Sequence, residues 1–215
     1  MTMKEKPLLI IIGNSNVGKS SITRLLVPNP KLLKGKTGKQ PGSTLLIKPI
    51  HQQNMAYEIV DLPGFGYIKH ASKRREEHIK RKIVGYIEKH YQNCFLALIV
   101  INILRIEDEI QKYYIDNQAT IPLSFELFNL FREFDVPMII VVNKIDKLSQ
   151  FDKEHKLTFF TNTAREYNIP LTKFDDLKNL RREDITYLEF SALKKTNLHE
   201  LKKIVKHFLI QSEIP

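Results

Sequence analysis

The chain has 215 residues, a formal net charge of +10 and one cysteine, Cys94. This length supports one well-buried core, and we expect a single domain over residues 1–215. The lone cysteine excludes an intrachain disulfide framework and a multi-cysteine metal site. The most apolar run, 94–104, is interrupted by Asn102 and is too short to span a membrane. No cleavable leader is recognisable before residue 8, so we expect a cytoplasmic monomer without a membrane partner.

The positive charge is concentrated in the first part of the chain. Residues 1–90 contain 17 Lys and Arg against 6 Asp and Glu, a net of +11, whereas the remainder contains 17 against 18, a net of −1. Such asymmetry indicates an anionic partner such as nucleic acid. A lysine-rich surface that only contacts solvent is the alternative interpretation.

Short apolar runs bounded by polar or glycine-rich turns predict strands, and longer stretches with helical spacing lie between them. The expected strands cover 8–12, 57–60, 95–101, 138–142 and 187–190. The expected helices cover 19–27, 71–91, 123–134, 150–167 and 197–211. Because most of these strands lack polar alternation, they are typical of strands covered on both faces. The sequence therefore predicts an α/β fold with a mostly parallel central sheet and helices on both faces.

Two segments depart from this alternation. Residues 43–50, joined to the next strand by the polar turn HQQN, are expected to form one antiparallel edge strand as half of a hairpin. Residues 104–122 are the least regular stretch, and we expect a surface excursion there. No function can be assigned to that excursion from its sequence.

The stretch GNSNVGKSS follows the first strand and opens the first helix. It matches GxxxxGK[ST], in which glycines let successive backbone amides converge on phosphate oxygens at the positive end of a helix. Lys19 is expected to reach the β- and γ-phosphates, and Ser20 to place its hydroxyl on Mg²⁺. The expected phosphate-binding residues are Gly13, Asn14, Ser15, Asn16, Val17, Gly18, Lys19, Ser20, Ser21 and, from a later motif, Gly64. The motif predicts a nucleoside triphosphate site and does not define the base.

NKID, residues 143–146, places polar side chains at the carboxyl end of a predicted strand, where open α/β sheets bind ligands. Asp146 can accept hydrogen bonds there from guanine N1 and the exocyclic amine, a donor pair that adenine lacks. Hydrogen bonds to charged groups each contribute about 1.5–3 kcal/mol. Asn143 is expected to brace the loop, the stem of Lys144 to cover the base, and the Ala192 amide to donate to guanine O6. The expected guanine-binding residues are Asn143, Lys144, Asp146, Ser191, Ala192 and Leu193.

DLPGFG, residues 61–66, is expected to form part of a switch. Asp61 would hold the Mg²⁺ shell, and Gly64 would donate its amide to the γ-phosphate. Upstream, KTGKQPGST carries Thr44, which we expect to close over Mg²⁺ and the γ-phosphate, with Thr37 as the alternative. Loss of the γ-phosphate would release both segments. The expected switch residues are Thr44, Asp61, Pro63, Gly64 and Phe65, and the expected magnesium ligands are Ser20, Thr44 and Asp61.

Basic residues flank both switch segments. Four lysines lie in or beside the first, and a larger group follows the second. The candidates for RNA contact are Lys69, Lys73, Arg74, Arg75, Arg81 and Lys82. Contacts to phosphate from these positions would depend on the bound nucleotide and weaken as salt rises. A helix face that contacts only solvent is the alternative.

Taken together, the motifs resemble those of the EngB (YihA) family of small P-loop GTPases, in its archaeal-type branch. GNSNVGKSS, KTGKQPGST, DLPGFGY, NKID and SALKKTN occur in the family's order and spacing over nearly the whole chain. The resemblance implies the TRAFAC (Ras-like) GTPase fold and GTP hydrolysis. In bacterial relatives it also implies a role in assembly of the large ribosomal subunit. Bacterial relatives usually have a tyrosine where Phe65 stands, and residues 104–122 depart from their pattern.

Two other functions compete with a ribosome-assembly switch. A signalling or regulatory GTPase would act on a protein partner without RNA, although the terminal QSEIP offers no cysteine for a lipid. A nucleotide kinase would also use a P-loop, but NKID and DLPGFG have no place in it.

Intrinsic hydrolysis is expected to be slow. Many GTPases orient the attacking water with a glutamine after the switch glycine, and Phe65 cannot hydrogen-bond water. An arginine finger, which commonly supplies the missing element, raises the rate by about 10³ to 10⁵. Alternatively, Asn16 in GxxNxGKS resembles the asparagine that helps K⁺-activated GTPases hold K⁺ near the phosphates. A purely loop-stabilising role for Asn16 remains the other interpretation.

Overall fold

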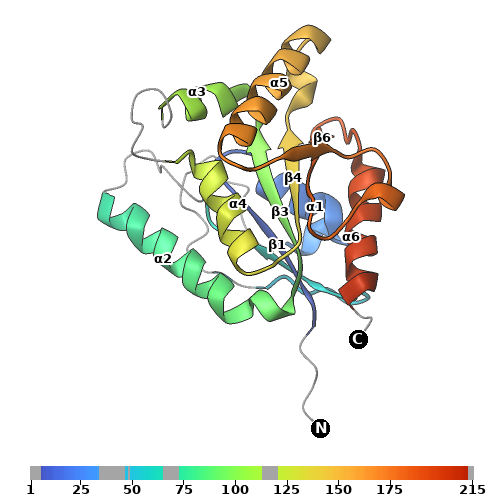
Figure 1. Cartoon of the computed structure of the whole chain (residues 1–215). Coiled ribbons are helices and arrows are strands. Elements are labelled where there is room, and N and C mark those ends of the chain that lie inside the picture. Colours follow the sequence, from blue (N-terminus) through green and yellow to red (C-terminus); the bar gives the residue numbers. More distant parts are fainter. Residues whose placement is uncertain (1–5, 34–46, 48, 65–72, 113–120, 213–215) are drawn as a thin grey trace.

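The structure of the protein, a computed structural model, describes residues 6–33, 47, 49–64, 73–112 and 121–212. A six-stranded sheet in the order β2-β1-β3-β4-β6-β5 forms its centre, and every strand pair is parallel (Figure 1). The strands are β1 (Leu8–Gly13), β2 (Glu58–Asp61), β3 (Cys94–Asn102), β4 (Met138–Asn143), β5 (Leu171–Lys173) and β6 (Ile185–Phe190). The helices are α1 (Lys19–Leu26), α2 (Lys73–His90), α3 (Ile106–Ile110), α4 (Leu123–Glu133), α5 (Gln150–Glu166) and α6 (Leu198–Ser212).

Helices cover both faces of the sheet, as predicted. One core lies between the sheet and α2, α3, α4 and α5, and its largest side chains are the phenylalanines Phe125, Phe128, Phe131 and Phe160. The other core lies between the sheet and helices α1 and α6. Within the described residues, no helix is both long and apolar enough to cross a bilayer.

The central strands are buried along their length, which explains their continuous apolar sequences. All residues of β1, β4 and β6 are buried, and in β3 only the last, Asn102, is partly exposed. Register aligns the ends of these strands, because Gly13 pairs with Val100, and Asn102 pairs with Asn143. The loops that carry the phosphate and guanine motifs therefore leave the sheet at the same edge.

The expected antiparallel edge strand over 43–50 is wrong. All six strands are parallel, and the described part of that segment makes one antiparallel bridge, between Ile50 and Ile59. Both backbone hydrogen bonds of this bridge form, at 2.7 and 3.1 Å. Pro49 directly precedes Ile50 and has no amide hydrogen, so it cannot donate to a continued ladder. Residues 43–46 and 48 lie outside the described residues.

Residues 104–110, part of the expected surface excursion, are more regular than their sequence suggested, although Leu104, Arg105 and Asp108 are exposed. They belong to a 3₁₀ turn, Ile103–Arg105, and to helix α3. Ile106 and Ile110, one helical turn apart, are buried in the core of the α2 and α4 face.

A second element, the strand β5, was also not predicted from the sequence. It has only three residues, two of them exposed, and it pairs with β6 at the edge of the sheet.

Candidate functional site: a nucleotide-binding edge

Positive backbone φ angles shape the phosphate loop between β1 and α1. Gly13 has φ +147° and Gly18 has φ +108°, conformations that L side chains rarely adopt. A Cβ on Gly13 would lie 2.1 Å from the Val100 carbonyl oxygen, and one on Gly18 would lie 2.3 Å from the Asn143 side-chain nitrogen. Asn16 is also left-handed, at φ +64°. Both motif positions therefore require glycine, because any other residue would strain the backbone and its Cβ would clash with a neighbouring atom.

Lys19 lies at the start of α1 and is buried. Its ammonium group donates to the carbonyl oxygens of Gly13, at 2.9 Å, and Asn14, at 2.8 Å. Burial lowers the pKa of Lys19 to about 8, and the negative charge of Asp61 opposes that shift. Because an ammonium has three hydrogens, one donor remains for an anion held above the loop. The predicted role of Lys19 in phosphate binding fits this geometry.

Ser20 and Asp61 meet, although 41 positions separate them. The Ser20 hydroxyl donates to the Asp61 carboxylate at 2.9 Å. Burial raises the pKa of Asp61, and the charge of Lys19 together with hydroxyl hydrogen bonds acts against this. One hydroxyl and one carboxylate are hard oxygen ligands of the kind Mg²⁺ takes together with phosphate oxygens and water. No group of three His, Cys, Asp or Glu among the described residues could hold a metal ion, and a phosphate-bound Mg²⁺ does not need one.

Gly64 lies against the phosphate loop. A Cβ on Gly64 would be 2.4 Å from the Ser15 hydroxyl and 3.0 Å from the Ser15 amide nitrogen. Pro63, which precedes it, is buried, and the amide of Leu62 donates to Ile11 of β1 at 2.9 Å. The segment expected to begin the second switch therefore lies beside the phosphate loop.

The guanine motif is tied directly to the phosphate loop. The Asn143 side chain donates to the Val17 carbonyl at 2.8 Å and accepts from the Ala192 amide at 3.0 Å. The Lys144 ammonium group donates to the Asn16 carbonyl at 2.7 Å, and the Lys144 backbone is left-handed at φ +72°. Asn143 therefore braces three loops at once, and Lys144 spans from the guanine motif to the phosphate loop.

Asp146 is held in place by the loop that follows β6. Its carboxylate accepts from the Ser191 hydroxyl at 2.6 Å, and its side chain is only 8% exposed. Ser191 itself is fully buried, and its hydroxyl oxygen accepts from the Lys194 amide at 3.0 Å. The second carboxylate oxygen of Asp146 lies 4.0 Å from the Lys147 ammonium nitrogen. Leu193, by contrast, is largely exposed.

Several predicted residues cannot be placed. Thr37, Thr44, Phe65 and Lys69 lie outside the described residues, and for Lys73 and Arg75 only the backbone is described. Arg74, Arg81 and Lys82 are exposed on α2. They lie on a helix whose buried side consists of Ile79, Ile83 and Ile87.

Comparison with known proteins identifies the family of the chain. A family model described as "50S ribosome-binding GTPase" matches residues 9–144. A "Probable GTP-binding protein EngB" from Pyrococcus horikoshii is 30% identical over 194 residues, which are 90% of this chain and 80% of that protein. The chain belongs to the EngB family of P-loop GTPases.

Other EngB relatives are also archaeal, as the archaeal-type resemblance predicted. The protein of that name from Methanosarcina barkeri is 35% identical over 142 residues, 66% of this chain and 64% of the relative. The one from Methanococcus aeolicus is 32% identical over 155 residues, 72% of this chain and 65% of the relative. The chain thus spans somewhat less than two thirds of the length of these two EngB proteins.

Solved structures show the same fold. The crystal structure of a probable GTP-binding protein EngB superposes with a TM-score of 0.73 at 28% identity, covering 95% of this chain and 99% of that one. Elongation factor SelB from Methanococcus maripaludis, in complex with a GTP analogue, superposes with a TM-score of 0.58 at 16% identity, covering all of this chain and 36% of that one. The EngB match confirms the predicted P-loop GTPase fold, and SelB supports the fold alone.

Sequence reasoning missed two groups beside the EngB motifs. The Thr23 hydroxyl donates to the Lys19 carbonyl at 3.1 Å and contributes to the environment of Asp61. The Glu109 carboxylate accepts from the Asn14 side chain at 2.7 Å. The spacing of Ile106 and Ile110 around this glutamate signals a short helix with a buried side, but nothing in the sequence places that helix beside residue 14.

Proposed function

We propose that this protein binds GTP with Mg²⁺ at the edge of the sheet where the phosphate and guanine loops lie. It hydrolyses GTP slowly and acts as a nucleotide-dependent switch in assembly of the large ribosomal subunit. The observation that carries the proposal is Asp146, a nearly buried carboxylate fixed by Ser191 and linked through Asn143 to the phosphate loop. A fixed acceptor of this kind suits the paired N–H donors of guanine. GTP hydrolysis follows from membership of the EngB family.

Ser20 and Asp61 would hold Mg²⁺, which would neutralise phosphate charge, with Thr44 proposed as a third oxygen ligand.

Asn16 is the proposed ligand of a K⁺ ion, since its left-handed backbone belongs to the phosphate loop and its side chain is exposed. Turnover in KCl and NaCl at matched ionic strength tests this part, because equal rates would contradict a K⁺ requirement.

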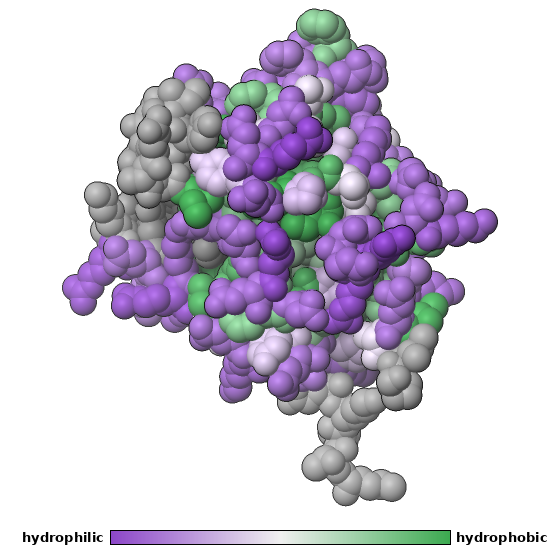
Figure 2. Space-filling view, in the orientation of Figure 1, coloured by the Kyte–Doolittle hydropathy of each residue, from purple (hydrophilic) through white to green (hydrophobic). Residues whose placement is uncertain are grey.

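Helix α2 supports an RNA partner. Its exposed side carries Arg74, Arg81 and Lys82, while Lys80 on the same helix is engaged with Glu126 of α4 at 2.9 Å. Figure 2 shows that hydrophilic residues cover most of the face formed by α2, α4 and α5, with apolar residues visible mainly in small areas between them. A basic, polar surface on the helix that follows the expected second switch in the chain fits phosphate contacts better than an apolar protein interface.

Sedimentation with purified archaeal large ribosomal subunits tests the ribosome part. The protein is expected to pellet with the subunits when loaded with a non-hydrolysable GTP analogue and to remain in the supernatant with GDP. The double variant Arg81→Glu, Lys82→Glu should lose at least tenfold in affinity, because phosphate contacts are replaced by repulsion. Lys202→Glu with Lys203→Glu, on the exposed side of α6, is the charge-matched control.

Equal sedimentation with GDP and the GTP analogue would contradict the switch. No sedimentation with either nucleotide would favour the signalling or regulatory GTPase that acts without RNA.

A further inference from the structure

Helix α3 carries a buried carboxylate that contacts the phosphate loop. Ile106 and Ile110 are 1% and 0% exposed, so both ends of this short helix are anchored in the core. Between them, Glu109 is directed at the loop after β1, where its Oε2 accepts from the Asn14 side-chain nitrogen at 2.7 Å. Its Oε1 accepts from the backbone amide of Ser124 in the first turn of α4, at 2.8 Å. The carboxylate therefore joins the phosphate loop to the beginning of a second helix.

Each contact of Glu109 suits its charge. The amide in the first turn of α4 lies at the positive end of that helix, where a carboxylate is stabilised. Burial raises the pKa of Glu109, whereas the hydrogen bonds from Ser124 and Asn14 lower it. A carboxylate can only accept, so the Asn14 amide must present its nitrogen to Glu109. The Asn14 Oδ1 atom then faces away, buried and without a partner among the described residues.

The contact leads to the phosphate-binding lysine in one further step. The Asn14 main-chain carbonyl accepts from the Lys19 ammonium at 2.8 Å. The side chain of Asn14 is fixed by Glu109, and its main chain in turn fixes Lys19. A change at Glu109 can therefore move the lysine without touching the nucleotide.

We propose that Glu109 is a positioning residue for nucleotide binding, which holds Asn14, and through it Lys19, in the geometry that receives the β-phosphate. This inference rests on the proposed function, because it concerns the same nucleotide. In this role Glu109 acts through the loop, by its contact with Asn14, and not on the nucleotide itself.

The test compares dissociation rates of a fluorescent GDP analogue from purified full-length variants in Mg²⁺ buffer. Asn14→Asp places a second carboxylate against Glu109, and we expect dissociation at least tenfold faster, about 1.4 kcal/mol. Adding Glu109→Gln should bring the rate back to within about threefold of wild type, because the glutamine amide donates to the new aspartate while its oxygen still accepts from Ser124. Glu109→Ala, which removes both contacts, should match Asn14→Asp.

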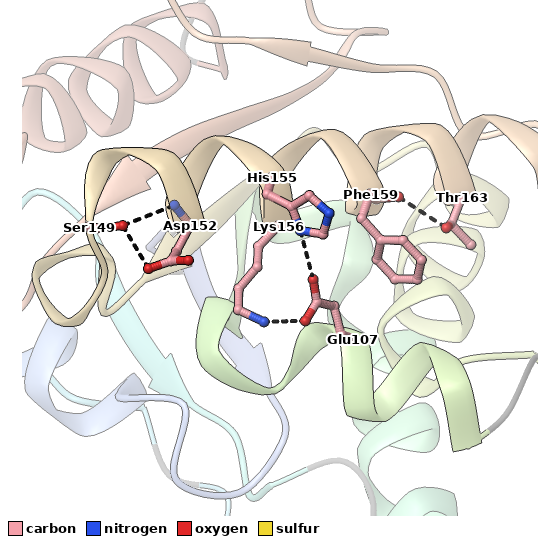
Figure 3. Close-up of polar contacts among 7 residues, drawn as sticks. All are labelled: Glu107, Ser149, Asp152, His155, Lys156, Phe159 and Thr163. Carbon is pink, nitrogen blue, oxygen red and sulfur yellow. Dashed lines mark hydrogen bonds and ion pairs between the residues drawn. The ribbon is translucent and has the colours of Figure 1, made fainter.

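A matched control lies two residues away on the same helix. Glu107 contacts Lys156 and lies 3.5 Å from His155, both on α5 (Figure 3). It makes no contact with the phosphate loop among its described interactions. Glu107→Ala therefore removes a carboxylate from α3 and should leave GDP dissociation within twofold of wild type. Thermal unfolding of every variant identifies any loss of fold, and Asn14→Ala replaces Asn14→Asp if the latter does not fold.

Rates within twofold of wild type for both Asn14→Asp and Glu109→Ala would overturn the positioning role. It would also be overturned if the double variant were no slower than Asn14→Asp, or if Glu107→Ala were as fast as Glu109→Ala. Wild-type protein that binds no guanine nucleotide in the same assay would instead overturn the proposed function, which separates the two failures.

Discussion

The phosphate loop and the guanine loop lie at the same edge of the sheet but are held by different means. The phosphate loop depends on backbone conformation, with two glycines at positive φ and a carbonyl or side chain within 2.3 Å of where their Cβ atoms would be. The guanine loop depends mainly on side chains, since Asn143, Asp146 and Ser191 form its hydrogen bonds. Substitution of a phosphate-loop glycine should therefore destabilise the fold, whereas substitution of a guanine-loop side chain such as Asp146 should keep the fold and change the ligand.

The largest effect is expected at Gly13. Gly13→Ala forces a methyl group toward the Val100 carbonyl in a strained backbone, so the free energy of unfolding should fall by at least about 2 kcal/mol. Gly85→Ala is the control, because Gly85 lies within α2 and its added methyl group would meet nothing within 4 Å. Helix propensity should then stabilise the protein by up to about 1 kcal/mol. Urea unfolding measures both. Equal stability of the two variants would contradict the conformational account.

Asn143 joins the two regions, and its loss should affect both. Asn143→Ala removes the acceptor of the Ala192 amide and the donor to Val17. We expect GDP affinity to fall by about tenfold or more, which corresponds to about 1.4 kcal/mol, together with weaker discrimination between GDP and ADP. Calorimetric titration with both nucleotides checks this. A variant that loses affinity while keeping full base discrimination would show that Asn143 serves the phosphate loop alone.

A smaller effect is expected outside the nucleotide edge. Glu189 of β6 accepts from Lys153 of α5 at 2.8 Å and also contacts Lys173 of β5. Burial alone would raise the pKa of Glu189, but the hydrogen bonds and charges of both lysines outweigh it and hold the pKa below its usual range. A carboxyl whose pKa is lower in the folded state stabilises the protein above its unfolded pKa, and this stabilisation is lost as pH falls through the folded pKa.

Glu189→Gln should therefore cost about 1 kcal/mol at pH 7 and progressively less as the pH is lowered through the acidic range. Nucleotide affinity is expected to stay unchanged. Urea unfolding at several pH values measures the difference. A cost that is independent of pH would contradict the ionic origin of the effect.

The contrast between local backbone patterns and side-chain contacts also explains which features could be predicted from the sequence. The glycines, Lys19 and Ser20 lie close together in the chain, so a local sequence pattern between a strand and a helix predicts their chemistry. The buried runs of β1, β3 and β4 equally define a parallel sheet. The alignment of Asp146 with Ser191 could also be anticipated, because the two loops follow strands that end at one edge.

Other features depend on distant contacts that no local pattern encodes. Glu109 and Asn14 are 95 positions apart, and only the packing of α3 brings them together. Strand β5 is too short and too polar to be recognised without its partner β6. The hairpin expected before β2 had a suitable sequence of apolar residues, but pairing in the described part is limited to Ile50 and Ile59.

The most direct test of the central claim is the affinity of wild type and Asp146→Asn for GDP, ADP and xanthosine diphosphate. We predict that wild type prefers GDP over ADP by at least about 100-fold, consistent with two charged hydrogen bonds, and that the variant loses GDP and gains the xanthine nucleotide. Asparagine presents a donor where aspartate presents only acceptors, and xanthine carries an oxygen in place of the guanine amine. Equal binding of GDP and ADP by wild type, or an unchanged preference in the variant, would contradict the assignment of the guanine site.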